Sequence, residues 1–359
     1  MSIEKLLSES HRYGSDEGFV LLGGGNTSYK KDGVLYVKAS GMELATIGVK
    51  GFVQMDLASM ENIWKNTYST DDDEREQEVL KDMMACRLEG ETARPSVEAL
   101  LHALLPFPYV VHLHPALVNG VTCSVDGEPT IARLFPEALW VELVKPGFIL
   151  AKIVRQRLAL LQENTGKTAN MIFLQNHGVF VGGESLEEIS TLYDTILRTI
   201  EEQLVRKPDF TPLVMDEKKR DAITSTLEML TGKRIVTALN QEIARYLTSE
   251  KAFAPVSSSF TPDHIVYSGF KPLWVDEGAS VEAEFGEYER LYGNEPKIIC
   301  VQNTGVFSVG EKPFPLFLDT IKVSVYTESF GGPLFMDEDM IRFIRTWEVE
   351  KYRSTMASS

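Results

Sequence analysis

Apolar and polar positions alternate along the first half of the chain with the spacings of short strands and amphipathic helices. Residues 1–14 predict a helix, and a glycine-rich turn leads into strands at 27–30 and 34–40. Asp56 closes a strand at 52–56 and is placed to cap a helix over 57–64. The same patterning predicts helices at 69–87, 95–105, 146–164 and 185–204, and strands at 109–114 and on both sides of a turn within 171–183.

One internal repeat stands out. Residues 171–196, MIFLQNHGVFVGGESLEEISTLYDTI, resemble residues 297–321, KIICVQNTGVFSVGEKPFPLFLDTI. A Lys-Pro pair precedes the shared Gln-Asn by similar distances in both, which favours a duplication over two unrelated units that converged. The copy has Thr304 where the first unit has His177, so the second unit is expected to be structural or modulatory and to hold no second metal ion.

The repeat and the composition suggest two parts joined by an arm. Residues near 206–222 are charged and include Pro208 and Pro212, which is typical of a connection. We therefore predict a domain at 1–205, a connecting arm at 206–238, and a C-terminal α/β unit at 239–359 that partially duplicates the first.

Composition narrows the function classes. The 359 residues have 43% hydrophobic and 25% charged residues, which is normal for a globular protein with a sizeable core. A net charge of −16 argues against nucleic acid or an anionic membrane as the partner. Three scattered cysteines indicate a reducing compartment. Neither a signal peptide nor a membrane span is predicted, so we expect a cytoplasmic protein.

Three of the six histidines form a candidate metal site. His112 and His114 lie at i and i+2 of a predicted strand, so both imidazoles project from one face. His177 precedes a glycine in the turn between two apolar strands. Three imidazoles with one open position suit a catalytic zinc ion; the alternative is three separate histidines satisfied by backbone groups. His102 is interpreted as a neighbour of such a site or a surface residue, and His11 and His264 as structural.

Three short segments could bind an anion. The first is the turn that ends in Asn26, Thr27 and Ser28; the second contains Lys38, Ser40 and Gly41; the third contains Ser96, at a predicted helix start. Glycine-rich turns are more often only turns, but three on an acidic chain favour a phosphate or carboxylate pocket. Glu98, close to the third segment, is the candidate proton-transfer group, the alternative being a surface glutamate at a helix start.

These segments together resemble the class II aldolase/adducin family. The matching stretches are GGGNTS, VKASG, RPSVEALLHALLP, VVHLHP, WVELVKPGF and LQNHGVFVGG, in family order over roughly residues 15–205. The sequence is most similar to the aldolase portion of bifunctional rhamnulose-phosphate aldolase/alcohol dehydrogenase proteins. The similarity includes stretches such as TPDHIVYSGFKPLWVD and VQNTGVFSVG. Because this chain has no G-x-G-x-x-G after a strand, we predict no dehydrogenase activity.

The resemblance implies a three-layer α/β/α fold with a mainly antiparallel central sheet, often assembled as a homo-tetramer. It implies a divalent metal ion, most simply Zn²⁺, on His112, His114 and His177, with Glu98 as acid/base. By position, the implied phosphate-binding residues are Asn26, Thr27, Ser28, Ser40, Gly41 and Ser96, with Lys38 as an added charge.

The expected reaction is retro-aldol cleavage of a ketose 1-phosphate to dihydroxyacetone phosphate and an aldehyde. A sugar-phosphate 4-epimerase would use the same ligands. A non-catalytic, adducin-like interaction protein is the alternative from another functional class, although such a protein has no need for an intact set of metal-binding histidines.

Overall fold

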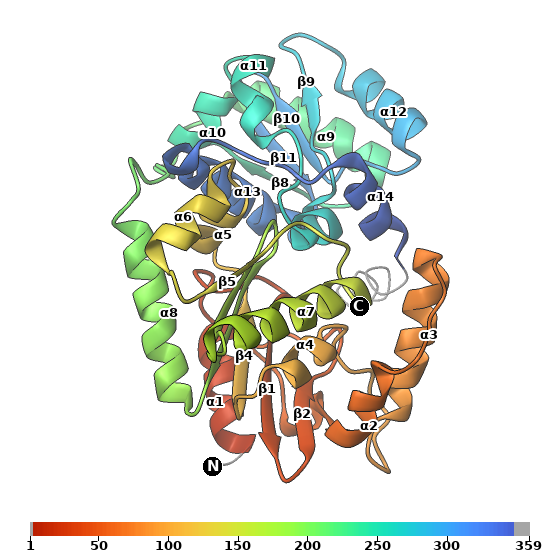
Figure 1. The fold of residues 1–359 in the computed structure, drawn as a ribbon. Coiled ribbons are helices and arrows are strands. Elements are labelled where there is room, and N and C mark those ends of the chain that lie inside the picture. Colours follow the sequence, from red (N-terminus) through yellow and green to blue (C-terminus); the bar gives the residue numbers. More distant parts are fainter. Residues whose placement is uncertain (1–2, 348–359) are drawn as a thin grey trace. The chain divides into compact units, whose positions relative to one another are not determined.

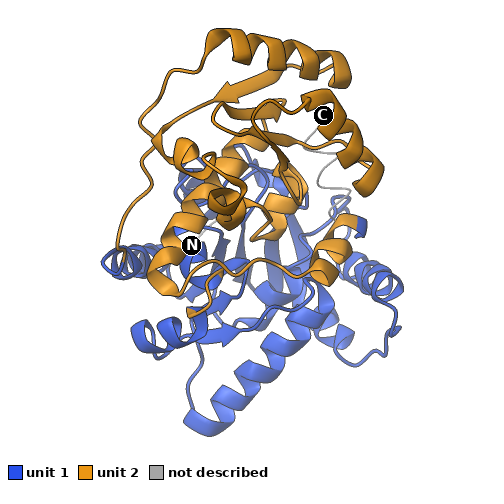
Figure 2. Ribbon diagram, turned by 90° about the horizontal axis from the view of Figure 1, so that it is seen from above, with its two compact units in different colours: residues 1–122, 127–203, 346–359 blue, residues 123–126, 204–345 orange. Residues whose placement is uncertain are grey.

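The structure is a computed structural model that describes residues 3–347. It divides into two compact units: unit 1 comprises residues 1–122, 127–203 and 346–359, and unit 2 comprises residues 123–126 and 204–345 (Figure 2). Each unit is built around its own sheet (Figure 1).

Unit 1 contains a seven-stranded sheet with the order β3-β2-β1-β4-β7-β6-β5. Every neighbouring pair is antiparallel except β5 and β6, which confirms the predicted, mainly antiparallel sheet. The strands are β1 (Asn26–Lys31), β2 (Val34–Lys38), β3 (Phe52–Asp56), β4 (Tyr109–Leu113), β5 (Leu139–Val141), β6 (Met171–Leu174) and β7 (Gly178–Gly183).

Helices cover both faces of this sheet, which confirms the three-layer arrangement. On one face lie α1, α5 and α8, where α8 contacts both other helices and all three contact central strands; on the other lie α2, α3, α4 and α7 (Figure 1). The helices are α1 (Ile3–Gly14), α2 (Leu57–Ile63), α3 (Asp72–Ala85), α4 (Ala99–Leu104), α5 (Ala116–Thr122), α6 (Gly127–Leu134), α7 (Phe148–Thr165) and α8 (Leu186–Glu201), with a 3₁₀ turn at Val49–Gly51.

Side-chain capping explains some of these boundaries. The carboxylate of Asp56 accepts the Ser59 N–H at 2.7 Å and begins α2, as predicted. Ser185 begins α8 in the same way. The prediction for residues 95–105 is wrong at its start, because Pro95 forms a β-bridge with Ala39 and α4 begins only at Ala99.

Unit 2 repeats the second half of unit 1. Its four-stranded sheet has the order β8-β11-β10-β9, and the pairing directions match those of β4-β7-β6-β5. Both edge strands even read Leu-Trp-Val, at 139–141 and at 273–275. The strands are β8 (Ile235–Ala238), β9 (Leu273–Val275), β10 (Ile298–Val301) and β11 (Gly305–Val309).

The helices of unit 2 also lie on two faces, with α9 and α12 on one and α10 and α13 on the other. They are α9 (Glu217–Thr231), α10 (Gln241–Tyr246), α11 (Glu250–Phe253), α12 (Val281–Tyr292), α13 (Pro313–Thr327) and α14 (Glu338–Thr346), with short turns at Ala254–Val256, His264–Ser268 and Glu328–Phe330. The predicted arm, 206–238, therefore contains α9 and β8, and β8 belongs to the sheet.

The strand register corrects one step in the argument for duplication. Aligning the two edge strands places Lys145 after β5, whereas Lys271 precedes β9. The Lys-Pro pairs are therefore not equivalent, and the repeat rests on the strand topology and the turns. Those turns agree closely: φ is 56° at Asn176 and 52° at Asn303.

The same register shows what the copy lost. Val179 and Phe180 of β7 pair with Leu113 and His112, while Val306 and Phe307 of β11 pair with Ala238 and Thr237. The positions of His112, His114 and His177 therefore correspond to Thr237, Leu239 and Thr304. None of these replacements is a good zinc ligand.

Lys30, on β1, is a partly buried lysine whose effect on stability can be tested. Its ammonium group donates to the carbonyls of Leu105 and Phe107, and burial lowers its pKa to about 7. In the unfolded chain a lysine has a pKa near 10.4. Between about pH 7 and 10 the unfolded state therefore binds more protons than the folded state, and the contribution of Lys30 to the free energy of unfolding rises with pH.

We therefore expect the free energy of unfolding of wild type, minus that of Lys30→Met, to rise by up to about 1.4 kcal/mol per pH unit between about pH 7 and 10. The difference should level off below pH 7. Urea unfolding of both proteins across this range measures it, and two parallel pH curves would show that Lys30 stays charged in the fold.

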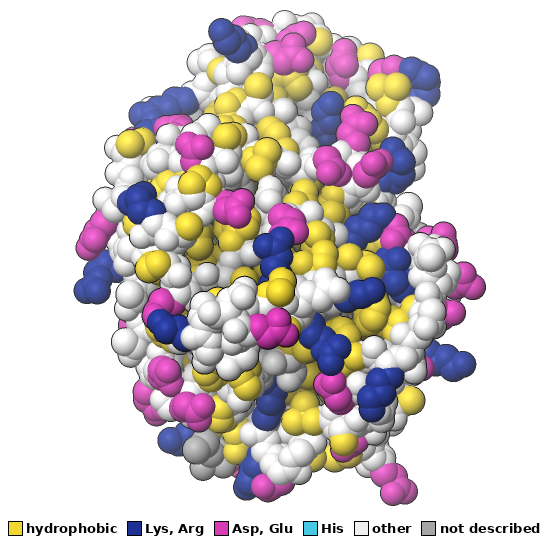
Figure 3. Space-filling view, in the orientation of Figure 1, with side chains coloured by type: hydrophobic (Ala, Val, Ile, Leu, Met, Phe, Trp, Pro, Cys, Tyr) yellow, Lys and Arg dark blue, Asp and Glu magenta, His cyan; other side chains and the backbone are white. Residues whose placement is uncertain are grey.

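The surface has no dominant charge sign on the face shown in Figure 3, where acidic and basic side chains are interspersed. Among the described residues, no helix combines the length and the apolar composition that crossing a bilayer requires.

Candidate metal centre

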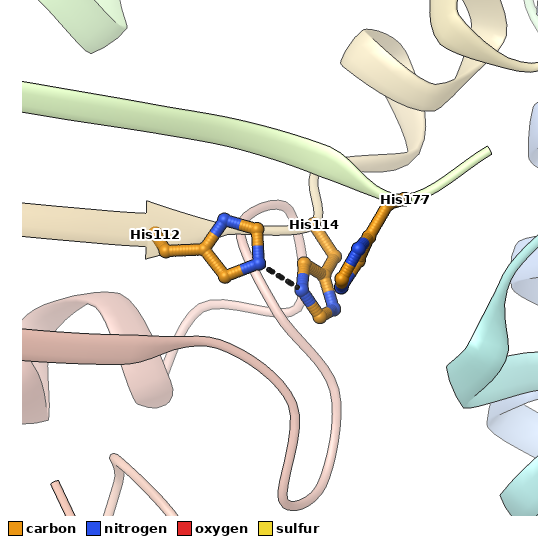
Figure 4. A group of neighbouring side chains, drawn as sticks. All are labelled: His112, His114 and His177. Carbon is orange, nitrogen blue, oxygen red and sulfur yellow. Dashed lines mark hydrogen bonds between the residues drawn. The ribbon is translucent and has the colours of Figure 1, made fainter. Parts of the chain in front are cut away.

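Three histidines converge at the end of β4 (Figure 4). His112 lies within β4, His114 follows the strand directly, and His177 lies in the turn before β7. Their candidate ligand nitrogens all lie within 4.8 Å of one another, and the Nε2 atoms of His112 and His114 are 2.9 Å apart. The antiparallel pairing of β4 with β7 brings the His-x-His segment next to the turn that carries His177.

A backbone contact sets the proton position on His112. Its Nδ1 lies 3.0 Å from the carbonyl oxygen of Val179, and only an N–H can bond to that oxygen. Nε2 therefore carries the lone pair and faces the other two imidazoles. Phe180 stacks on the ring at 3.9 Å and fixes its plane. This orientation is the one that a metal-bound histidine needs.

Glu98 lies beside the cluster. It is the residue that precedes α4, and its Oε1 is 3.4 Å from Nε2 of both His112 and His177. The side chain is buried, yet Oε1 has no hydrogen-bond partner among the described residues. An unsatisfied buried carboxylate oxygen costs free energy, so its position next to three ligand nitrogens needs a functional explanation.

The electrostatics of the cluster suit a cation. Burial alone raises the pKa of Glu98, but the imidazoles beside it outweigh this effect and hold the pKa well below its usual range. Burial lowers the pKa of His112, despite the neighbouring carboxylate. Burial thus favours the neutral form of the His112 imidazole, which is the form that binds a metal ion. The donor set fits a divalent cation such as zinc.

Two of the predicted anion-binding segments lie side by side. The Ser96 N–H donates to the Lys38 carbonyl at 3.0 Å, and the Ser40 N–H donates to the Arg94 carbonyl at 2.8 Å. Lys38 Nζ donates to the carbonyls of Gly23 and Met42, which joins the first segment to the second. The Ser96 N–H is therefore not available to bind an anion at a helix start, because it already donates a hydrogen bond to the Lys38 carbonyl.

The first segment is not a loop throughout. Residues 26–28 are the first residues of β1, and their side chains are buried. The Thr27 hydroxyl forms a hydrogen bond with the Ser10 hydroxyl at 2.7 Å, and the Ser28 hydroxyl forms one with His102 at 2.7 Å. These two hydroxyls are thus engaged inside unit 1. The amide of Asn26 lies at the centre and donates to Glu98 Oε2 at 2.5 Å.

His102 is the residue whose role sequence reasoning left open. It is fully buried on α4 and bonds both Ser28 and Asn26. His11 and His264 have their own partners: Nε2 of His11 contacts the Ile47 carbonyl at 2.7 Å, and Nε2 of His264 contacts Asp319 at 3.0 Å. Both contacts are consistent with structural roles.

Gly178, which follows His177, leaves no room for a side chain. A Cβ atom there would lie 2.5 Å from the Leu113 carbonyl oxygen and 2.8 Å from Cδ2 of His114. We expect Gly178→Ala to destabilise the protein by about 1–3 kcal/mol and to weaken metal binding, because β4 and its histidines must shift.

Gly48→Ala is the matched control, since no described atom lies within 4 Å of a Cβ at that position. Thermal unfolding and metal titration of both variants measure the effect. Equal metal affinities would contradict a tightly fitted centre.

Comparison with known proteins identifies a family for the part of the chain that contains the three histidines and Glu98. The model of the class II aldolase and adducin N-terminal domain matches residues 5–204. The chain is 24% identical, over an alignment 418 positions long, to the uncharacterized oxidoreductase YuxG of Bacillus subtilis (strain 168), and the alignment covers 99% of this chain and 58% of that protein. The chain thus spans less than two thirds of that relative.

Solved structures also resemble the chain. The N-terminal class II aldolase domain of a conserved protein from Thermoplasma acidophilum is 27% identical, with a TM-score of 0.48, covering 56% of this chain and 93% of that one. The L-fuculose-1-phosphate aldolase of Thermus thermophilus is 16% identical, with a TM-score of 0.37, covering 56% of this chain and 94% of that one.

Proposed function

Since the chain belongs to the class II aldolase and adducin N-terminal domain family, we propose that it is a metal-dependent lyase that cleaves a ketose 1-phosphate to dihydroxyacetone phosphate and an aldehyde. One observation carries the proposal. Glu98 Oε1 is buried without a hydrogen-bond partner in the described part of the chain, and it faces two of three clustered histidines. A carboxylate placed in this way is suited to exchanging a proton with a substrate.

His112, His114 and His177 are the residues that would hold the metal, and three imidazoles with an open position suit zinc best. When bound, the ion supplies positive charge against the negative charge that develops on the sugar oxygens as the carbon–carbon bond breaks. No lysine Schiff base is required.

Glu98 is assigned the proton transfer at carbon. In the cleavage direction the bond between carbons 3 and 4 breaks, and its electron pair stays on the dihydroxyacetone phosphate half. Carbon 4 becomes the aldehyde as its hydroxyl loses a proton to a separate base. In the cleavage direction Glu98 first takes up a proton from solvent and then delivers it to carbon 3, while the separate base returns the proton of the carbon 4 hydroxyl to solvent. In the reverse direction the Glu98 carboxylate removes the proton from carbon 3. A low pKa keeps Glu98 ionised for this second role.

The phosphate group is assigned to the paired segments around Ser40, Gly41 and Ser96, with Asn26 nearby. Lys38 supplies positive charge at this place and holds the segments together through the Gly23 and Met42 carbonyls. Thr27 and Ser28 support these residues from within unit 1, since their hydroxyls are already bonded there.

Incubation of the zinc-loaded protein with a panel of ketose phosphates, 1-phosphates and pentulose 5-phosphates included, tests this proposal. We expect dihydroxyacetone phosphate and an aldehyde in equal amounts, and no product after chelation. An isomeric sugar phosphate without fragments would instead indicate the 4-epimerase. Less than about half an equivalent of bound metal after reconstitution would support the adducin-like, non-catalytic alternative, because a three-histidine zinc site binds one ion per chain.

A further inference from the structure

Four buried side chains form a line of hydrogen bonds that ends at Glu98. The Ser28 hydroxyl bonds Nδ1 of His102 at 2.7 Å, Nε2 of His102 bonds Oδ1 of Asn26, and Nδ2 of Asn26 bonds Oε2 of Glu98 at 2.5 Å. Asn26 also donates to the Ser96 hydroxyl at 3.3 Å. The line therefore joins β1 to α4 and ends beside the metal centre.

The direction of each hydrogen bond in this line is determined by its last member. A carboxylate only accepts, so Asn26 turns its NH₂ group toward Glu98 and its oxygen toward His102. That oxygen also only accepts, so Nε2 of His102 carries a proton. Burial lowers the pKa of His102 well below its usual value, which keeps the ring neutral. Nδ1 is then unprotonated and accepts a hydrogen bond from the Ser28 hydroxyl.

We propose that His102 is a positioning residue, which acts through Asn26 to hold Glu98 with Oε2 bonded and Oε1 free to exchange a proton with the substrate. The proposal rests on the function proposed above for Glu98. Without the His102 N–H, the Asn26 amide loses the contact that prevents its rotation, and an amide oxygen turned toward Glu98 would repel the carboxylate.

The ordinary alternative is a core histidine that merely has its two nitrogens satisfied. Packing against Phe180 at 5.4 Å is compatible with both views. What separates them is the consequence of losing only the Nε2 donor. A purely structural histidine affects stability, whereas a positioning residue affects turnover at constant metal content.

Two substitutions separate the roles of the two ring nitrogens of His102. His102→Gln places an NH₂ group near the position of Nε2 and so can still donate to Asn26. His102→Asn is shorter, reaches only the position of Nδ1, and leaves Oδ1 of Asn26 without its donor. Leu101→Met, at the neighbouring buried position of α4, controls for repacking of this helix.

We expect His102→Asn to lower kcat for dihydroxyacetone phosphate release by about 10–100-fold, with metal content and KM nearly unchanged. His102→Gln should recover most of the loss, and Leu101→Met should match wild type. Equal kcat values for the asparagine and glutamine variants, or a loss explained by released metal, would overturn the proposal.

A measurement without substrate keeps the proposal separate from the proposed function. In protein labelled with ¹⁵N-asparagine, the Asn26 side-chain amide is identified by its absence in Asn26→Asp. Its protons should exchange slowly with solvent in wild type and in His102→Gln, and at least about 10-fold faster in His102→Asn, because a lost buried hydrogen bond exposes the amide. Equal exchange in all three proteins contradicts the role of His102. Protected exchange without any lyase activity contradicts only the assigned reaction.

Discussion

Replacing Glu98 by glutamine is expected to leave one metal ion bound and to lower turnover by about 10²–10⁴-fold, the range typical of a lost general acid or base. The three imidazoles remain, so metal binding persists. The amide cannot take up or deliver a proton at carbon. Turnover of a cleaved ketose 1-phosphate, together with elemental analysis of the purified variant, measures both effects.

Glu76→Gln is the matched control for this prediction. Glu76 is another buried glutamate of unit 1, but its carboxylate accepts the Phe148 N–H at the start of α7 and contacts Arg75. Its loss should affect stability and leave turnover per folded molecule unchanged. Turnover that survives in Glu98→Gln would contradict the assignment of Glu98 to proton transfer.

Replacing His177 by threonine, the residue at the equivalent position of unit 2, is expected to weaken zinc binding by at least about 100-fold and to abolish turnover. Three protein ligands are the usual minimum of a catalytic zinc site, and the variant keeps only His112 and His114. Competition with a chromogenic chelator gives the affinity.

The reciprocal variant, Thr304→His, controls for the location of the site. Unit 2 has Thr237 and Leu239 where unit 1 has His112 and His114, so one added imidazole should not create a second centre. Binding of a second equivalent of zinc by this variant would contradict the alignment of the two sheets. Zinc affinity unchanged in His177→Thr would exclude His177 as a ligand.

Only the His112 and His114 pair of the candidate metal centre follows from local spacing, and the family resemblance supported the distant His177 as the third ligand. His112 and His114 lie two residues apart along a strand, and His177 lies in a turn between two apolar strands that had to pair with each other. Antiparallel pairing of β4 with β7 then brings all three together. Asp56 was identified as a helix cap for the same reason, since its partner is only three residues away.

Long-range pairing decided the features that sequence patterns missed. The start of α4 was predicted too early because the bridge between Ala39 and Pro95 joins distant segments. Thr27 and Ser28 were predicted both as strand residues and as part of an anion-binding segment, and in the sheet they pair with β4 and their side chains are buried. The partners of His102 lie 74 and 76 residues away, so no spacing rule could identify them.

Hydrogen exchange at carbon tests the central claim most directly, because it requires neither the aldehyde nor the identity of the natural sugar. The zinc-loaded protein is incubated with dihydroxyacetone phosphate in D₂O, and proton NMR follows the hydroxymethyl carbon. We predict stereospecific replacement of one proton by deuterium, which is lost on chelation and in Glu98→Gln but retained in Glu76→Gln. No exchange by protein that carries a full equivalent of zinc would contradict the account.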